Sequence, residues 1–408
     1  MKANYKEDGE VYEALRNALA WDTIYEPSKD RCISTGSRIW NDSWGGYSMY
    51  CWDTYFAALL ASIDNRELAY SNFIEMTSER TKEGFVPNYA AATGSKSLDR
   101  SQPPVASQIA LELYNRYQEI WFLEYVFEDL FHWNQWFYHN RQIEDGMFAW
   151  GSNPFEKVTD NEWEYKGVDD RFGAALESGL DNSPMYDDIP FNKESHYLCL
   201  GDVGLTSLVL RDTEALLQIA QILKQEKKEE ILHRSIQVIH QNFDKFWCEE
   251  EGMYLNWRTD IKQFSLRKAP TLFYALFNSN IPKDHIMRII QEHFYNEKEF
   301  YGEWMLPSIA RCDVAYKEQN YWRGRIWAPL NYLVYEALKK HDYCQDAAHE
   351  LAEKSKKLIL KEWLNYGHVH ENYNADTGEG CDITTGSDRF YHWGALLSYI
   401  VLKENRRI

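Results

Sequence analysis

Two acidic side chains that lie far apart in the sequence occupy segments poorly explained as scaffold. Asp181 stands in the segment Gly-Leu-Asp-Asn-Ser-Pro, where glycine and proline favour an irregular backbone. The neighbouring rings of Phe172 and Tyr186 could desolvate its carboxyl group and raise the carboxyl pKa. Glu371 stands in the segment His-Val-His-Glu-Asn-Tyr-Asn. One protonated and one ionised carboxyl group, about 6.5–9.5 Å apart, are what inverting hydrolysis of a glycosidic bond needs. We interpret Asp181 as the acid and Glu371 as its partner.

Both assignments have competing interpretations. Asp181 is also typical of an Asx turn or a helix cap, and Glu177 competes for the acid role. Before Glu371, His368 and His370 suggest either a metal site or a plain surface turn. A metal site would need a further ligand from a helix or a distant segment, and the sequence reveals none. We therefore expect no bound metal and no cofactor.

Aromatic residues make up 15% of the chain, and many stand beside Asp, Asn, Gly and Arg. Flat apolar faces mixed with hydrogen-bonding groups suit a pyranose ring, so we expect a small carbohydrate ligand. Three segments combine these features: one opens a predicted helix, one precedes a second helix, and one gathers rings and guanidinium groups. Their candidate sugar-binding residues are Trp52, Asp53, Gln102, Tyr321, Trp322, Arg323 and Arg325.

Composition and charge exclude several classes of partner. The 408 residues carry a net charge of −19, whereas nucleic acid and anionic membranes require a basic face. The N-terminal residues contain no apolar signal region, and the longest apolar run, at 56–63, is too short to span a bilayer. The seven cysteines contain no Cys-x-x-Cys pair, so we expect neither disulfides nor a zinc–cysteine site. We expect a cytoplasmic protein, and a homo-oligomer stays open.

Apolar residues recur at helical spacing along most of the chain, and strand-like alternation is scarce. Helices are predicted at 10–20, 52–63, 66–80, 104–117, 119–140, 205–223, 231–243, 269–278, 283–293, 326–340, 345–362 and 390–403. Residues 171–188 lack both periods, so we expect a loop there. Turns with glycine recur at 83–88, 145–150, 251–256 and 366–371. The pattern predicts an all-α chain, with residues 1–408 as a single (α/α)6 barrel whose long loops form a site at one end.

Six segments in the same order resemble glycoside hydrolase family 63, over residues 50–395. They are Trp-Asp-Thr-Tyr-Phe at 52–56, Ser-Gln-Pro-Pro at 101–104, Glu-Ser-Gly-Leu-Asp-Asn-Ser-Pro at 177–184, Tyr-Trp-Arg-Gly at 321–324 with Trp327, Glu-Asn-Tyr-Asn at 371–374 and Trp-Gly-Ala at 393–395. The resemblance implies an (α/α)6 barrel that hydrolyses α-glycosides with inversion. Asp181 matches the family's general acid and Glu371 its general base. The positions that line the sugar pocket match Asp53, Gln102, Tyr321, Trp322 and Arg323, and Trp393 is expected to join them.

The chain departs from the family in two respects. Members that trim glycoprotein glycans carry a large β-rich domain, whereas this chain is similar in size to compact bacterial members that cleave glucosylglycerate or mannosylglycerate. Arg325 stands where the family pattern Tyr-Trp-Arg-Gly-Pro-x-Trp has proline. If the aglycone is anionic, we expect Arg325, Arg323 or Arg100 to meet its carboxylate.

The expected function is that of an exo-acting inverting α-glycoside hydrolase, which releases glucose, or alternatively mannose, from a small α-glycoside. Suitable substrates are glucosylglycerate or a short α-gluco-oligosaccharide. Three alternatives stay open: an α,α-trehalase, a disaccharide phosphorylase and a non-catalytic sugar-binding protein. Trehalose cleavage, strict phosphate dependence and sugar binding without turnover would distinguish them.

Overall fold

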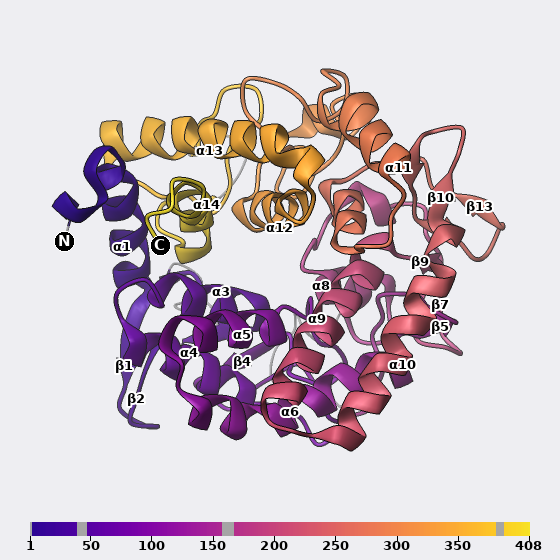
Figure 1. Cartoon of the computed structure of the whole chain (residues 1–408), viewed down its shortest axis with the longest axis horizontal. Coiled ribbons are helices and arrows are strands. Elements are labelled where there is room, and N and C mark those ends of the chain that lie inside the picture. Colours follow the sequence, from indigo (N-terminus) through magenta and orange to yellow (C-terminus); the bar gives the residue numbers. More distant parts are fainter. Residues whose placement is uncertain (1, 39–46, 157–166, 381–386) are drawn as a thin grey trace.

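The helices form two concentric rings around a common axis (Figure 1). The computed structural model describes residues 2–38, 47–156, 167–380 and 387–408. Within these residues six helices form a closed inner ring, each packed against the next. They are α3 (Cys51–Ala61), α5 (Ala106–Tyr117), α9 (Val203–Ile222), the 3₁₀ helix η4 (Pro270–Phe277), α12 (Ala328–Lys339) and α14 (Leu396–Glu404).

The outer ring covers the inner one. It consists, over the described residues, of α1 (Gly9–Asp22), α4 (Arg66–Ser78), α6 (Ile120–Asn140), α10 (Glu226–Asn242), α11 (Lys283–Arg288) with the π-helix Ile289–Phe294, and α13 (Gln345–Tyr366). Composition explains the two positions. All residues of α3 are buried, as befits an inner helix that is apolar on every side, whereas α10 buries only Leu232 and Ile239. This arrangement is the predicted (α/α)6 barrel.

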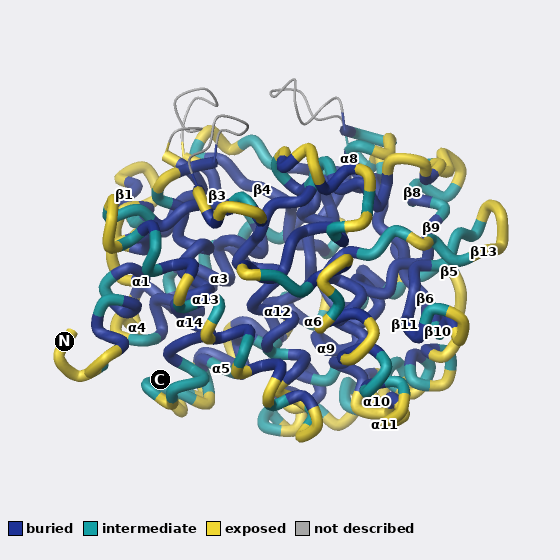
Figure 2. The backbone as a smooth tube through the Cα atoms, turned by 90° about the horizontal axis from the view of Figure 1, so that it is seen from above, coloured by how far each residue is buried: buried dark blue, intermediate teal, exposed yellow. Residues whose placement is uncertain are grey.

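Short antiparallel strands join the helices. The pairs are β1 (Thr23–Glu26) with β2 (Arg31–Ser34), β3 (Ser48–Tyr50) with β4 (Tyr89–Ala91), β5 (Gln142–Glu144) with β6 (Met147–Phe148), β7 (Phe191–Asn192) with β8 (Tyr197–Leu198), and β10 (Trp247–Cys248) with β11 (Met253–Tyr254). β12 (Trp257–Arg258) lies between β9 (Leu200–Gly201) and β13 (Gln263–Phe264). Figure 2 shows β3, β4 and α8 (Arg171–Ser178) at one end of the barrel, with the buried backbone in its interior.

The expectation of a loop throughout residues 171–188 is wrong in its first half, where α8 lies. The side chain of Asp170 accepts a hydrogen bond from Phe172 N at the start of α8, and Gly179 ends it with φ 72°. A helix of only eight residues is too short to show a clear apolar period, which is why its caps are the better signal. The short 3₁₀ helix η2 (Pro184–Tyr186) follows.

Two other predicted helices lie where they were expected but are of a different helix type. The segment predicted at 269–278 is the 3₁₀ helix η4, and the one predicted at 283–293 changes from α to π at Ile289. The remaining short 3₁₀ helices are η1 (Lys2–Asp8), η3 (Phe243–Phe246), η6 (Tyr316–Glu318), η7 (Asp342–Cys344) and η8 (His392–Ala395). The recurrent turns each contain a glycine with positive φ, as expected for a glycine in a turn: Gly84, Gly146, Gly252 and Gly367. Among the described residues, every helix is too short or too polar to cross a membrane.

Candidate active site

The segments that precede the inner helices meet at one end of the barrel, and their side chains form the site. Trp52 and Asp53 lie in the first turn of α3, Trp327 is the residue before α12, and Trp393 lies in η8 before α14. Asp181 follows α8, which covers the same end. Chain segments separated by more than three hundred residues therefore contribute side chains to one region.

Glu371 lies in the segment between α13 and η8, and its side chain is fully buried. The hydroxyl group of Tyr321 donates to its Oε1 at 2.9 Å, and the backbone N–H of Asp388 donates to its Oε2 at 3.2 Å. Burial raises the pKa of Glu371 to about 8, with Asp388 and Asp53 adding to the rise. The two donors act in the opposite direction, because they stabilise the ionised carboxylate that a general base needs.

Asp181 is held by the turn that ends α8. Gly179 lies against the indole of Trp52, where an added Cβ would come within 2.6 Å of the ring. The next side chain, Asn182, accepts a hydrogen bond from the backbone N–H of Trp322 at 2.9 Å, which ties this turn to the segment before α12. Burial and then the charge of Asp53 raise the pKa of Asp181 to about 7. A carboxyl group of this kind keeps its proton close to neutral pH, as a general acid must.

A third carboxyl group, that of Asp53, completes the cluster. Burial raises its pKa to about 6, and the hydroxyl group of Tyr391 donates to Asp53 Oδ1 at 2.6 Å. The phenol of Tyr321 lies in the electrostatic field of both Glu371 and Asp181. Asp181, Glu371 and Asp53 thus lie close enough to influence one another's charge, and their catalytic roles stay a prediction. Asp181 keeps partial exposure while Glu371 and Asp53 are buried, so Asp181 is the member of this cluster closest to solvent.

Four indole rings surround this cluster. Trp322 stacks on Trp327 with ring centroids 3.6 Å apart, and Trp52 lies 6.4 Å from Trp322. Trp393 meets both Trp52 and Trp327 edge to face, at 5.7 and 5.5 Å. The predicted aromatic lining is therefore assembled from α3, η8 and the segment before α12. Such rings offer flat apolar faces to the C–H face of a sugar.

The sequence left Glu177 as a competitor for the role of the acid. In the structure Glu177 has a structural role instead. Its carboxylate forms a buried ion pair with Arg141, with distances of 2.5 Å from Nε and 2.8 Å from Nη2. The backbone N–H groups of Ser101 and Gly151 also donate to it, at 3.0 and 2.7 Å. Four donors therefore hold this carboxylate within a structural network. Gln102 accepts from the backbone N–H of Trp52 at 3.2 Å and so supports the start of α3.

The two candidate arginines are bound to other protein groups. The guanidinium of Arg323 pairs with Glu318 at 2.6 Å and with Asp187 at 2.9 Å, and it lies 3.3 Å from the carbonyl oxygen of Asn182. Arg325 is fully buried, donates to the side chain of Asn372 and reaches the carbonyl oxygen of Gly380 at 3.0 Å. Both therefore fasten segments that carry Asp181 or Glu371. A direct contact of either arginine with substrate stays a prediction.

Residues that sequence reasoning missed support the cluster from behind. The ring of His392 donates from Nε2 to the carbonyl oxygen of Asp53 at 3.0 Å, and its Nδ1 lies 3.0 Å from Asp22 Oδ2. Burial raises the pKa of Asp22 to about 6. Burial alone would lower the pKa of His392, but the hydrogen bond and charge of Asp22 raise it above its ordinary value. The segment Phe-Tyr-His-Trp at 390–393 was the available signal, because polar rings stand directly before Trp393.

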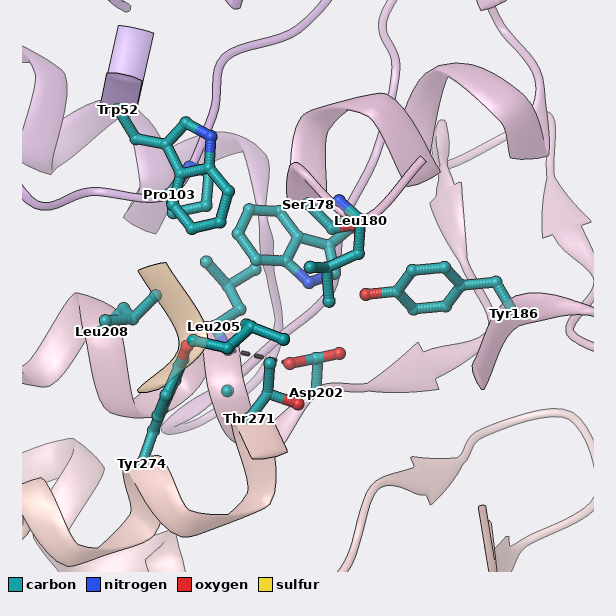
Figure 3. Close-up of a pocket in the computed structure, with 13 residues that line it drawn as sticks. Trp52, Pro103, Ser178, Leu180, Tyr186, Asp202, Leu205, Leu208, Thr271 and Tyr274 are labelled. Atoms are coloured by element: carbon teal, nitrogen blue, oxygen red, sulfur yellow. Dashed lines mark hydrogen bonds between the residues drawn. The ribbon is translucent and has the colours of Figure 1, made fainter. Parts of the chain in front are cut away.

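A small enclosed cavity lies beside the turn that carries Asp181 (Figure 3). Trp52, Leu180 and Tyr186 line it together with Asp202 and Tyr274. The backbone N–H of Leu205 donates to Asp202 Oδ1 at 2.8 Å, so Asp202 caps α9. The cavity is mostly apolar, and its lining includes none of the three carboxyl groups of the cluster.

The side chains of His368 and His370 lie apart from the carboxyl cluster. Glu371 faces Tyr321, whereas the preceding side chain, His370, faces Glu362 of α13, with 3.1 Å between Nε2 and Oε2. Neighbouring side chains on an extended backbone point to opposite sides, which explains this division. The third potential metal ligand that the sequence did not reveal is therefore present on α13.

Comparisons with known proteins find similar sequences among glycoside hydrolases. Residues 46–394 match the family described as mannosylglycerate hydrolase MGH1-like glycoside hydrolase domain. The mannosyl-oligosaccharide glucosidase of Saccharomyces cerevisiae is 28% identical over 272 residues, which cover 60% of this chain and 31% of that enzyme, so this chain matches about a third of the yeast enzyme's length. A mannosylglycerate hydrolase of Rubrobacter radiotolerans is 24% identical over 348 residues, which cover 74% of each chain.

The fold has a close counterpart among solved structures. The crystal structure of GH63 mannosylglycerate hydrolase from Thermus thermophilus in complex with glucose has a TM-score of 0.75 to this chain, at 18% sequence identity. The superposition covers 96% of this chain and 99% of that one. This similarity supports the (α/α)6 barrel along nearly the whole length of the chain.

Proposed function

Since the chain belongs to the MGH1-like glycoside hydrolases, we propose that it cleaves small α-glycosides with inversion and releases one sugar at a time. Glucose is the first choice for that sugar and mannose the second. The observation that carries this proposal is that Asp181 and Glu371 both act on the phenol of Tyr321, beside a group of packed tryptophan rings. We include exo-action in the proposal, with the buried carboxyl groups of Glu371 and Asp53 facing a single terminal sugar.

The proposed reaction uses one proton donor and one proton acceptor. The sugar lies among Trp52, Trp322 and Trp393, and Asp53 accepts hydrogen bonds from its hydroxyl groups. Asp181 gives its proton to the glycosidic oxygen as the bond from that oxygen to the anomeric carbon breaks. A water molecule attacks the opposite face, and Glu371 takes the proton that the water loses. The products are the free sugar of inverted configuration and the alcohol.

The protonation states set a condition on this mechanism. The productive site carries a proton on Asp181 and none on Glu371, while burial raises the pKa of Asp181 to about 7 and that of Glu371 to about 8. The proposed base, Glu371, therefore has the higher pKa of the two, whereas the mechanism requires the acid, Asp181, to keep its proton while Glu371 has lost its own. The productive form is therefore a minor one in the free protein near neutral pH, and the donors on Glu371 favour it.

A glycerate conjugate is the most informative substrate to try first. Two of the similar proteins bear the name mannosylglycerate hydrolase. Arg100 is the cation whose charge reaches Asp181, where it lowers the carboxyl pKa. Its guanidinium lies 2.8 and 2.9 Å from the carboxylate oxygens of Asp99, so it would act on an anionic aglycone through the local field. Kinetics with glucosylglycerate, mannosylglycerate and neutral glycosides would separate these aglycones.

Proton NMR of the first product tests the reaction class. The protein is incubated with α-linked glucosides, mannosides and their glycerate conjugates, and the anomer formed before mutarotation is recorded. We expect the β-anomer. A first-formed α-anomer would refute inversion, and a requirement for phosphate, with a sugar phosphate as product, would identify a phosphorylase. Rapid cleavage of trehalose in preference to the other glycosides would identify a trehalase, and sugar binding without any turnover a binding protein.

A further inference from the structure

Three side chains with metal-binding groups meet behind the extended segment that leads to Glu371. Glu362 lies in the last turns of α13, and His368 and His370 follow that helix. One ligand atom from each lies within 4.8 Å of the other two. Glu362 and His370 are buried, whereas His368 is partly exposed.

The local backbone explains why both imidazoles face the same side. Val369 forms a parallel bridge with Phe390, so the stretch from His368 to His370 is extended. In an extended backbone side chains two positions apart point to the same side. The two rings lie 5.2 Å apart at 86°, and α13 places Glu362 opposite them. Two nitrogens from one strand and one oxygen from a helix thus converge.

The geometry is close to what a tetrahedral metal ion requires. Zinc binds imidazole nitrogen and carboxylate oxygen at about 2.0–2.2 Å, which puts neighbouring ligand atoms roughly 3.3 Å apart. The distance between His370 Nε2 and Glu362 Oε2 is already 3.1 Å. His368 would need to approach, and its partial exposure leaves room for a rotation of the ring. The same exposure offers a path for the ion and a position for a water ligand.

We infer that Glu362, His368 and His370 bind a divalent transition-metal ion of the zinc type. Imidazole with carboxylate suits zinc and its neighbours better than calcium or magnesium, which prefer oxygen ligands alone. The bound ion would link α13 to the strand that leads to Glu371, one residue after His370. The role is structural, because the ligands face away from the carboxyl cluster. In the structure His370 Nε2 and Glu362 Oε2 form a hydrogen bond, and the backbone of Gly380 also donates to Glu362.

Metal binding by the full-length protein tests this inference directly. The protein is stripped with a chelator, dialysed and titrated with ZnCl₂ by calorimetry, and the retained zinc is measured by elemental analysis. We expect one zinc ion per chain and a rise in Tm with zinc concentration, because a ligand of the folded state alone stabilises it. Cobalt(II) in place of zinc should give the visible absorption of a tetrahedral site.

Variants separate this site from adventitious binding. His368→Ala should weaken zinc binding at least tenfold and abolish the rise in Tm, and its partial exposure makes loss of folding a poor explanation. His233→Ala, on the exposed face of α10, is the matched control and should bind zinc like the wild type. Glu362→Gln should also weaken binding. Absence of saturable binding in the wild type, or unchanged affinity in His368→Ala, would overturn the inference.

Discussion

Replacing Asp181 with asparagine tests the central assignment, because asparagine keeps the shape of the side chain but cannot transfer a proton. The value of that proton depends on the leaving group. The aglycone of an O-glycoside leaves slowly unless its oxygen is protonated, whereas fluoride leaves without protonation. Loss of the acid should therefore slow cleavage of an O-glycoside and spare cleavage of the α-glycosyl fluoride of the same sugar.

The magnitude follows from the environment of Asp181. With a pKa of about 7, most Asp181 side chains are protonated at pH 6, whereas an ordinary aspartate, with a pKa of about 3.9, would be protonated in fewer than one molecule in a hundred. Burial thus increases the active acid on the order of a hundredfold. Proton donation itself contributes about 10²–10⁴-fold. We expect Asp181→Asn to lose that factor on O-glycosides and less than tenfold on the fluoride.

Two further variants make the assay decisive. Glu371→Gln should lose activity on both substrates, because attack by water needs the base whatever the leaving group. Glu177→Gln should lose stability without a preference between the substrates. Initial rates are measured at about pH 7.5, between the two expected limbs, on both substrates for each purified variant. An equal loss on both substrates in Asp181→Asn, or retained O-glycoside cleavage, would refute the assignment of the acid.

Three more predictions follow from burial and charge. The plot of kcat/KM against pH should be a narrow bell with limbs near pH 7 and pH 8, because activity needs Glu371 ionised and Asp181 protonated; a plateau from pH 5 to 9 would contradict it. The Tm of Asp181→Asn relative to that of the wild type should rise between pH 4 and pH 8. The reason is that the folded wild type keeps a proton on Asp181 that the unfolded chain releases near pH 4, so the wild type loses stability as the pH rises. A Tm difference independent of pH would argue against this linkage. Glu177→Gln should lower the free energy of unfolding by about 3–5 kcal/mol in urea titrations, because it leaves Arg141 charged and buried, and a loss below about 1 kcal/mol would show that Arg141 tolerates the loss of its partner.

Helices and their order were readable from the sequence, because helical periodicity depends on residues three and four apart. Which helices form the inner ring was not predicted, although the difference in burial between α3 and α10 follows from their apolar and polar compositions. The short helix α8 escaped, since eight residues carry too little periodicity and only its caps, Asp170 and Gly179, mark it. Turn glycines such as Gly146 were also readable, because their backbone requirement is local.

The sequence motifs indicated which residues could form the site, but they did not indicate which side chains pair with each other. Asp181 and Glu371 stood out by their neighbours in the chain, but Glu177, which shares the segment of Asp181, fits almost the same description. Its pairing with Arg141 decides that it is structural, and that contact depends on how the end of α6 and α8 pack. Glu362 went unnoticed for the same reason, as an acidic residue on an outer helix is ordinarily solvated.

The amino-acid pattern alone therefore determined the helical barrel, because helical periodicity is local. It also singled out the aromatic residues and the two carboxyl groups as candidates, because these stand out by their immediate neighbours. Only the tertiary structure decided which of the 63 acidic and 44 basic side chains meet. It assigned Arg323 to Glu318 and Asp187, Tyr391 to Asp53, and Glu362 to His370. Arg323 and Asp187, like Tyr391 and Asp53, lie more than a hundred residues apart, and a residue's local sequence does not specify which distant partner the fold will bring to it.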